Sequence, residues 1–578
     1  MSGDRWATTG LLSFMGQIWV ADDVPSIRFP LYSRGNVGEV FPNVLTALTA
    51  TLIGDAVASG QLASVAEMGV LRASEMEGPS VASGVFGGYL YQNASTMRLF
   101  GVRAPGMSVA DVDQQVIGDV PGLPPYVRRP GDRDVLASGR IVRHMVRLVR
   151  RLDLAPLDLA RADAQAWLAT MPDVSDSSDA DLIDWLDSFP PRQGESMRRL
   201  LSSSIGAGIP LGLLQRMLER SNQSGLLNRI VGGTGEIDSA RLAQRMWSLA
   251  RIVAEDHQLT AAFDVGLDRI AERTEGTEFA AALEAFLAEH GHRCNDEYEL
   301  ASPAWSMDPS PVYAAVDRLR RVPRDRDPAL AARRLADDAD VALGEAVAAA
   351  PRPLRRMLRR VARQSRAGAI GRERAKDILV LENLGARKVL HELVRRASER
   401  GGPHDPRLAF CVTAAELSDF VASPGSFAQV IAERAALRDH LDARVPPDWF
   451  EGRIPDPANW KVRSEHVVPA PTMGSIGHGI AVSGGVASGP ARVVSHPGDP
   501  RGLEPGEVLV CAITDPSWTP LFLGAVAVVC ESGALLSHAA IVARELGIPA
   551  VLSVPGITGV VDGTMLHVDG NTGEVRVG

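Results

Sequence analysis

The chain has 578 residues, of which 45% are hydrophobic, and its formal net charge is −10. This length predicts two to four domains with sizeable cores, and the acidic balance excludes a global electrostatic attraction to nucleic acid or to an anionic membrane. The 60 basic residues include only three lysines, Lys376, Lys388 and Lys461. Because none of them follows a glycine, a P-loop nucleotide site is excluded as well.

The four cysteines are far apart and form no C-x-x-C pair. This spacing argues against a structural zinc site or a disulfide framework and fits a reducing cytoplasm. Residues 10–21 are apolar, but the stretch is short and runs into Asp22 and Asp23 without a basic start or a cleavage-like end. We therefore expect folded structure there, and a cytoplasmic protein that has no membrane or nucleic-acid partner.

Residues 1–136 are predicted to be irregular, because prolines and glycines recur throughout them. Residues 36–45 predict a loop that leads into a helix near Thr46. Residues 79–97 are rich in glycine, serine and small apolar side chains, which indicates close backbone packing or, alternatively, a loop that lines a substrate site. Residues 118–134 have the composition of a connector.

From residue 137 to about residue 441, apolar residues recur at the three- and four-residue spacing of amphipathic helices. Helices are expected at residues 140–151, 181–189, 197–204, 213–221, 240–257 and 277–290. This part of the chain is therefore predicted to be mainly helical.

A polar, charge-dense loop follows the last of these helices and contains Arg293, Asp296 and Glu297. Binding groups collect in such loops. His290 and His292 could suggest a metal site, but the sequence offers no third ligand nearby, so we predict none.

Residues 352–366 predict an arginine-rich helix, and arginines in such runs usually form a solvated face. A second helix is expected after Gly371, with Arg372 and Lys376 four residues apart on one face. Two cations that face the same way repel each other unless an anion lies between them. The pair therefore favours a site for a phosphoryl group.

Six prolines in residues 445–477 predict a semi-rigid tether. Beyond it the pattern changes to short β-type runs at residues 491–495, 508–513, 525–530 and 550–554. Residues 565–568 and 574–577 flank a turn sequence and predict a hairpin. Residues 478–578 are therefore expected to form a compact domain of strands with one or two short helices.

Within this domain, Ser537 is a predicted helix N-cap, and the helix runs until Gly547, with Pro549 beyond it. His538 then lies in the first turn, where the helix dipole favours an anion and disfavours imidazolium. A neutral, nucleophilic imidazole at this point can accept a phosphoryl group. The simpler alternative is a histidine in an ordinary α/β turn.

The run from Ser537 to Val551, together with Thr514 to Pro520, resembles the swivelling phosphohistidine domain of the PEP-utilising enzymes, the group of PEP synthase, pyruvate phosphate dikinase and rifampin phosphotransferase. The resemblance implies that His538 carries a phosphoryl group between two distant sites, with Gly533 and Ser537 in its loop. One departure is Ala534, where the family usually has a glycine.

Upstream, residues 32–46 and 291–310 are similar to the substrate domain of the rifampin phosphotransferase branch, and Arg372-Glu373-x-x-Lys376 resembles its element that presents cations to the phosphohistidine. The implied fold is an α + α/β multidomain chain. A mainly helical substrate domain spans residues 1–444, a tether residues 445–477, and a small β/β/α swivelling domain residues 478–578.

In this family an ATP-grasp domain or a TIM-barrel PEP site phosphorylates the histidine. Neither is recognisable in the sequence, and no lysine precedes Lys376, so we expect a separate ATP-grasp subunit that binds ATP and Mg²⁺, as in the split arrangement of phenylphosphate synthase. No cofactor is expected in this chain itself.

The resulting hypothesis is the histidine-bearing, substrate-binding subunit of a two-component dikinase with a small organic acceptor, most simply a hydroxyl. Arg372 and Lys376 would neutralise the moving charge, Arg293 would orient the acceptor, and Asp296 or Glu297 would serve as general base. One alternative is a non-catalytic protein that binds or sequesters a small molecule. Another is a PEP-dependent phosphocarrier.

Overall fold

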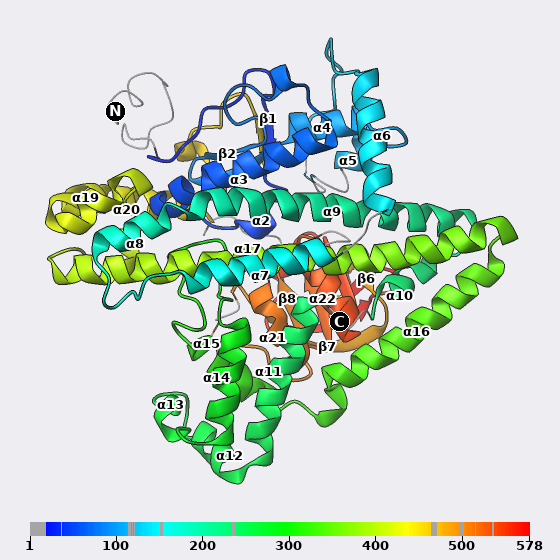
Figure 1. Cartoon of the computed structure of the whole chain (residues 1–578). Coiled ribbons are helices and arrows are strands. Elements are labelled where there is room, and N and C mark those ends of the chain that lie inside the picture. Colours follow the sequence, from blue (N-terminus) through cyan, green and yellow to red (C-terminus); the bar gives the residue numbers. More distant parts are fainter. Residues whose placement is uncertain are drawn as a thin grey trace.

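The computed structural model describes residues 19–35, 37–113, 117, 120, 122–150, 154–233, 237–463, 471–496, 499, 502–514, 516–533 and 537–578. A large helical region precedes a smaller, strand-rich domain at the end of the chain (Figure 1). This arrangement confirms the predicted fold class. We call residues 19–463 the helical region and residues 476–578 the C-terminal domain.

The helical region begins with a small antiparallel sheet. Its strands are β1 (Leu31–Ser33), β2 (Ser83–Phe86), β3 (Tyr89–Asn93) and β4 (Trp449–Glu451), in the order β2-β3-β1-β4. The strand β4 comes from the stretch that the sequence predicts as a tether. In that stretch Val445 donates to the carbonyl of Lys461 and Trp460 packs on Tyr89, so the chain up to Arg463 belongs to the helical region. Residues 464–470 lie outside the described part.

Three long helices form the centre of the molecule, α3 (Ala47–Met68), α9 (Phe189–Arg220) and α17 (Arg355–Glu399). The helix α3 begins directly after Thr46, where the sequence predicts a helix start, and the side chain of Thr46 caps it. The helices at 197–204 and 213–221 are instead one continuous helix, and α17 likewise runs through Gly371 without a break. The sequence prediction of separate helices was wrong because packing along α9 and α17 outweighs the cost of their internal glycines and of Pro210.

The other helices of the helical region surround this centre (Figure 1). Near the N-terminal sheet and along the long helices lie α2 (Val37–Val40), α4 (Ala94–Arg103), α5 (Val109–Val112), α6 (Val135–Arg150), α7 (Ala155–Ala169), α8 (Asp179–Leu186), α10 (Leu227–Val231), α18 (Pro406–Ala409), α19 (Leu417–Ala422) and α20 (Ala428–Asp442). A second group projects from the other side: α11 (Asp238–Glu255), α12 (His257–Asp264), α13 (Ile270–Arg273), α14 (Glu278–His290), α15 (Ser310–Leu319) and α16 (Pro328–Ala349).

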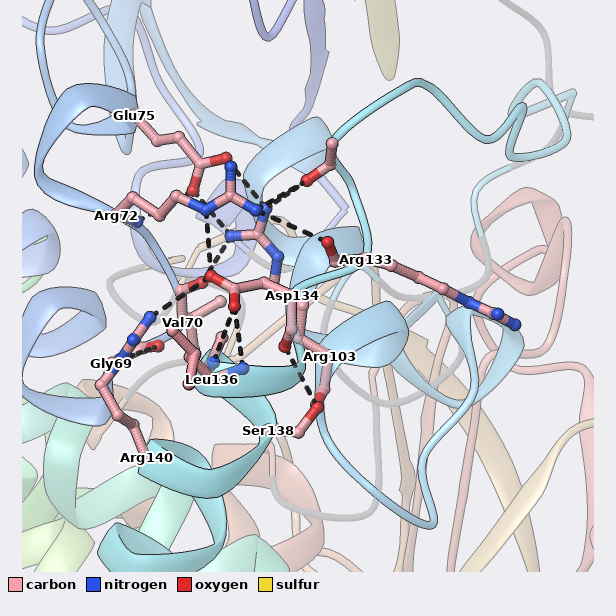
Figure 2. A network of polar contacts seen from close by, with 12 residues as sticks. Gly69, Val70, Arg72, Glu75, Arg103, Arg133, Asp134, Leu136, Ser138 and Arg140 are labelled. Atoms are coloured by element: carbon pink, nitrogen blue, oxygen red, sulfur yellow. Dashed lines mark hydrogen bonds and ion pairs between the residues drawn. The ribbon is translucent and has the colours of Figure 1, made fainter.

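A buried ion pair fastens the predicted connector to the helical region. Arg103, at the end of α4, is paired through both terminal nitrogens with the carboxylate of Glu75 at 2.7 and 2.9 Å, and its Nε donates to the carbonyl of Asp132. Figure 2 shows this contact together with the neighbouring pair of Arg72 and Asp134. Because both partners of the buried pair are fully satisfied, the segment before α6 has a fixed position.

The C-terminal domain is built on one eight-stranded sheet in the order β5-β12-β11-β7-β8-β9-β10-β6. Its strands are β5 (Ile476–His478), β6 (Ile480–Ser483), β7 (Val486–Val493), β8 (Val508–Cys511), β9 (Ala527–Cys530), β10 (Ala550–Leu552), β11 (Met565–Asp569) and β12 (Glu574–Val577). The strands β7 to β10 are parallel, and β11 and β12 form the predicted hairpin. Two short helices, α21 (Thr519–Gly524) and α22 (His538–Leu546), follow β8 and β9.

These two helices dock the C-terminal domain onto the helical region. Both α21 and α22 pack against α11, while α21 also meets α15 and α22 meets α16. Ile541 of α22 lies in one apolar cluster with Ile370 of α17. In the described part of the chain, no helix is long and apolar enough to cross a membrane.

Candidate active site

The site forms where the parallel strands of the C-terminal domain end. The chain leaves β8 toward Thr514 and leaves β9 toward Gly533 and Ser537, so both segments lie at the carboxyl edge of the sheet, where α/β folds collect their ligands. Ser537 is the N-cap of α22, and its hydroxyl accepts from the backbone N–H of Ala540 at 3.4 Å. His538 therefore occupies the first turn of a nine-residue helix, as predicted.

Two threonines hold the imidazole of His538. The hydroxyl of Thr514 is 3.3 Å from Nδ1, and that of Thr519 is 3.5 Å from Nε2. The imidazole ring and the ring of Phe522 make a T-shaped contact. Thr514 and Thr519 were part of the motif by which the sequence resembles the family, but their direct contact with the histidine could not be derived from spacing alone.

His538 is only 7% exposed, yet its surroundings are polar and positively charged. Its pKa lies well below the ordinary value, first because of burial and then because of the positive charges of Lys376, Arg293 and Arg372. The imidazole is therefore neutral at physiological pH. These three cations come from the helical region, and we call them the cation cluster.

Acidic side chains fix each member of the cation cluster. The carboxylate of Glu297 accepts from Arg293 at 2.8 Å and lies 3.6 Å from the ammonium group of Lys376. Arg372 pairs with Glu373 at 3.0 Å. Burial raises the pKa of Glu297, but Arg293 and Lys376 outweigh burial and keep that pKa below its usual value.

The two acidic candidates of the polar loop face different neighbours. Glu297 is buried within the cation cluster, whereas the half-buried Asp296 accepts from the amide of Asn43 at 3.1 Å. Asp296 has φ of 62°, and this left-handed backbone turns the chain between the two residues. The structure thus brings Glu297 together with Arg293 and Lys376, and places Asp296 on the side of the N-terminal segment.

Asp377 is a central residue that the sequence analysis did not single out. Its carboxylate accepts from Arg293 and from the ring of His292 and is paired with Arg161 of α7. Burial raises its pKa, but the adjacent Arg293, His292 and Arg161 hold that pKa well below the ordinary value. Its position directly after Lys376 was the one signal available, because it places an acid beside the predicted cations.

Gly533 has φ of 150°, and a Cβ atom at this position would lie 2.9 Å from the side chain of Leu552. Its carbonyl accepts from the hydroxyl of Ser553 at 2.7 Å. The loop therefore needs glycine here. Ala534 lies outside the described residues.

The charge at this site decides what it can hold. Among the described residues, no group of three or more histidine, cysteine or acidic side chains is arranged to bind a metal ion. The groups around His538 are guanidinium and ammonium ions, which repel a divalent cation and stabilise a phosphoryl group. A neutral imidazole at a helix N-terminus, facing three cations, has the electrostatic surroundings that would stabilise a phosphoryl group on its ring.

The fold and the site resemble a helical substrate domain with the docked histidine domain of the PEP-utilising enzymes. Family models agree: residues 503–573 match the mobile domain of PEP-utilising enzymes, and residues 195–373 match the fourth domain of rifampicin phosphotransferase. The chain is thus similar to the rifampicin phosphotransferase branch of the PEP-utilising enzymes.

Several characterised and uncharacterised relatives are similar to the chain. The rifampicin phosphotransferase of Streptomyces sp is 30% identical over 54% of this chain and 36% of its own length. The prodigiosin synthesizing transferase PigC of Serratia marcescens is 28% identical over 61% of this chain and 40% of its own. The uncharacterized phosphotransferase YvkC of Bacillus subtilis is 46% identical over 17% of this chain and 12% of its own. The chain thus spans well under half the length of these relatives.

Proposed function

We propose that His538 accepts a phosphoryl group from a separate ATP-grasp subunit and passes it to a small organic acceptor bound by the helical region. The observation that carries this proposal is the neutral, buried imidazole facing Arg293, Arg372 and Lys376. Uptake of the phosphoryl group would place negative charge on the ring, where the three cations and the N-terminus of α22 stabilise it.

The transfer takes two steps at one imidazole. A P–O bond of the nucleotide breaks as a P–N bond forms on His538, and the P–N bond then breaks as a P–O bond forms on the acceptor hydroxyl. ATP and Mg²⁺ would be held by the donor subunit, which supplies the activated phosphoryl group. The docked arrangement corresponds to the second step, because His538 faces the helical region.

In this scheme the residues of the helical region have separate roles. Arg372 and Lys376 neutralise the phosphoryl charge, and Arg293, clamped by Glu297 and Asp377, orients the acceptor. Glu297 already neutralises two cations, and its lowered pKa makes it a poor proton acceptor. This leaves Asp296, on the side of the N-terminal segment, as the general base that we propose for an acceptor hydroxyl bound there.

Labelling the chain with its donor subunit tests the proposal. Purified chain is mixed with the candidate ATP-grasp protein and [γ-³²P]ATP and with [β-³²P]ATP, so that either nucleotide phosphoryl group is detected. Acid-labile, base-stable label is expected on the wild type and on His567→Ala, a variant of another histidine in the same domain, and none on His538→Ala. Label that persists in His538→Ala contradicts the proposal.

The second candidate is a non-catalytic protein that binds a small molecule. It is favoured by a cavity of about 500 Å³ beside α21. Tight binding of a small molecule, together with failure of both ATP-grasp and PEP-dependent donors to phosphorylate the chain, would support this candidate over the first.

A further inference from the structure

A cavity of about 500 Å³ lies between the helical region and the C-terminal domain. One wall consists of α15 and the preceding loop, including Asn295 and Trp305. The other consists of α21 with Leu503 and Pro505. Cavities of this size are typical of small-molecule sites, which occupy about 300–1,000 Å³ and often lie between domains. Because its walls belong to both parts, the cavity is complete only while the C-terminal domain is docked.

The lining is mainly apolar and its charges balance. Trp305, Leu319 and Leu521 contribute apolar surface, whereas Arg318 and Asp308 contribute one charge of each sign. Both charges are already engaged, since Arg318 donates to the carbonyl of Asp499 at 2.9 Å and Asp308 accepts from the N–H of Ser310 at 3.0 Å. The walls therefore favour an uncharged molecule over an ion.

A buried donor in this lining has no partner. Trp305 is 2% exposed, and within the described part of the chain its indole N–H makes no hydrogen bond. Such an unsatisfied group costs about 1–3 kcal/mol. Because this N–H is enclosed by protein, an occupant of the cavity would pack against the apolar ring of Trp305 and not against its N–H.

The cavity is also close to the candidate active site. Ser517 and Pro520 line it, and Thr519, which contacts His538, lies between them in the sequence. On the other wall, the backbone N–H of Trp305 donates to the backbone carbonyl of Arg293 at 2.8 Å. An occupant would thus touch segments that carry the histidine and segments that carry the cation cluster.

We propose that this cavity binds a small, uncharged, mainly apolar molecule, and that its occupation holds the C-terminal domain in the docked position. A ligand that contacts both walls binds the docked state and not the undocked one, so it shifts the equilibrium between them by its full binding energy. The proposal does not depend on whether His538 is phosphorylated.

The test uses Prodan, an uncharged naphthalene ketone whose fluorescence rises and shifts to the blue in apolar surroundings. Saturable binding of one Prodan per chain is expected. Ala314→Leu in α15 and Gly524→Leu in α21 should each weaken binding at least tenfold, because each fills the cavity from one wall. A Cβ at Gly524 meets Leu503 at an ordinary 3.5 Å, so this variant has room to fold. Ala285→Leu, exposed on α14, is the matched control with unchanged affinity.

Hydrogen exchange measures the effect on docking. Saturating Prodan should slow the exchange of amides in both α15 and α21 at least twofold in the wild type and leave Ala314→Leu unaffected. Circular dichroism shows whether each cavity-filling variant folds. If one of them does not fold, the Prodan affinity of the variant on the opposite wall decides the test. Wild-type affinity in both filling variants, no saturable binding, or protection of α15 without α21 would overturn the proposal.

Discussion

At the residue scale, the proposed phosphoryl transfer depends on the neutral imidazole of His538 and on the positive charges that face it. His538 loses hydration on burial, and the cation cluster further disfavours its protonation. The same cations stabilise the ring once it bears a phosphoryl group. The environment that makes imidazolium unfavourable is therefore the one that makes phosphohistidine favourable.

This lowered pKa predicts a pH dependence of docking. A histidine exposed by undocking has an ordinary pKa near 6.5, so below this pH the undocked state binds more protons than the docked state. Stability of the docked state should be greatest above pH 6.5 and fall on acidification, by about 1 kcal/mol between pH 7.5 and 5.5. Small-angle scattering at the two pH values measures the docked fraction.

The matched variant for this experiment is His538→Gln, which removes the titrating ring. Other buried histidines contribute in both proteins: burial, Arg293 and His292 lower the pKa of His290 to about 3, for example. The difference between wild type and variant isolates the contribution of His538. An equal loss of docking in both proteins would show that its pKa is not lowered.

Asp377 gives a second prediction at this scale. Asp377→Asn removes the charge that pairs with Arg161 and Arg293, and should lower the free energy of unfolding by about 3 kcal/mol, because it leaves buried charges uncompensated. Asp158→Asn, which removes an exposed ion pair with Arg374, is the control and should change it by less than about 1 kcal/mol. Urea unfolding of the three proteins measures both effects.

At the element scale, close contacts between long helices position the cation cluster. Gly60 of α3 faces α9, and a Cβ atom there would lie 2.2 Å from the carbonyl oxygen of Gly194. Gly60→Ala should therefore destabilise the fold by about 1–3 kcal/mol. Gly344→Ala in α16, where an added Cβ would meet no atom from outside its own turn of helix within 4 Å, should stabilise it by about 0.5–1 kcal/mol. Thermal unfolding distinguishes these opposite signs, and equal effects would contradict the packing described.

The sequence predicted single helices and hairpins better than the contacts between distant segments. The N-cap at Ser537 and the hairpin of β11 and β12 depend on nearby residues, and both were found as predicted. The continuity of α9 through Pro210 depends on its contact with α17, which no local pattern reports. The strand β4 was missed for the same reason, because it pairs with β1 from the far end of the helical region.

In the candidate site, too, residues defined by a local pattern were predicted, whereas residues defined by long-range contacts were missed. The sequence predicted His538, Arg372 and Lys376 from a helix terminus and from helical spacing, and the structure places these residues within electrostatic range of each other. Asp377, Thr514 and Thr519 act through contacts between distant segments. Such contacts become visible only once each part of the chain is folded, because no local sequence pattern reports them.

At the scale of the whole molecule, the proposed mechanism predicts that the apolar contact between α22 and the helical region decides which of the two transfer steps can take place. Ile541 packs against Ile370 and Ala240, so Ile541→Asp should weaken docking. Transfer to the acceptor should then slow at least tenfold, while phosphorylation of His538 by the donor subunit continues. Val561→Asp, a change at an exposed position of the same domain, should affect neither step. Equal slowing of both steps by Ile541→Asp would contradict a role in docking alone.

The most direct test of the central claim is to locate the phosphoryl group itself. After a brief reaction with ATP and the donor subunit, tandem mass spectrometry under neutral conditions should find it on a single residue, His538, among the 12 histidines of the chain. Addition of the acceptor should remove it from that peptide. A phosphoryl group on any other residue, with His538 unmodified, would contradict the account.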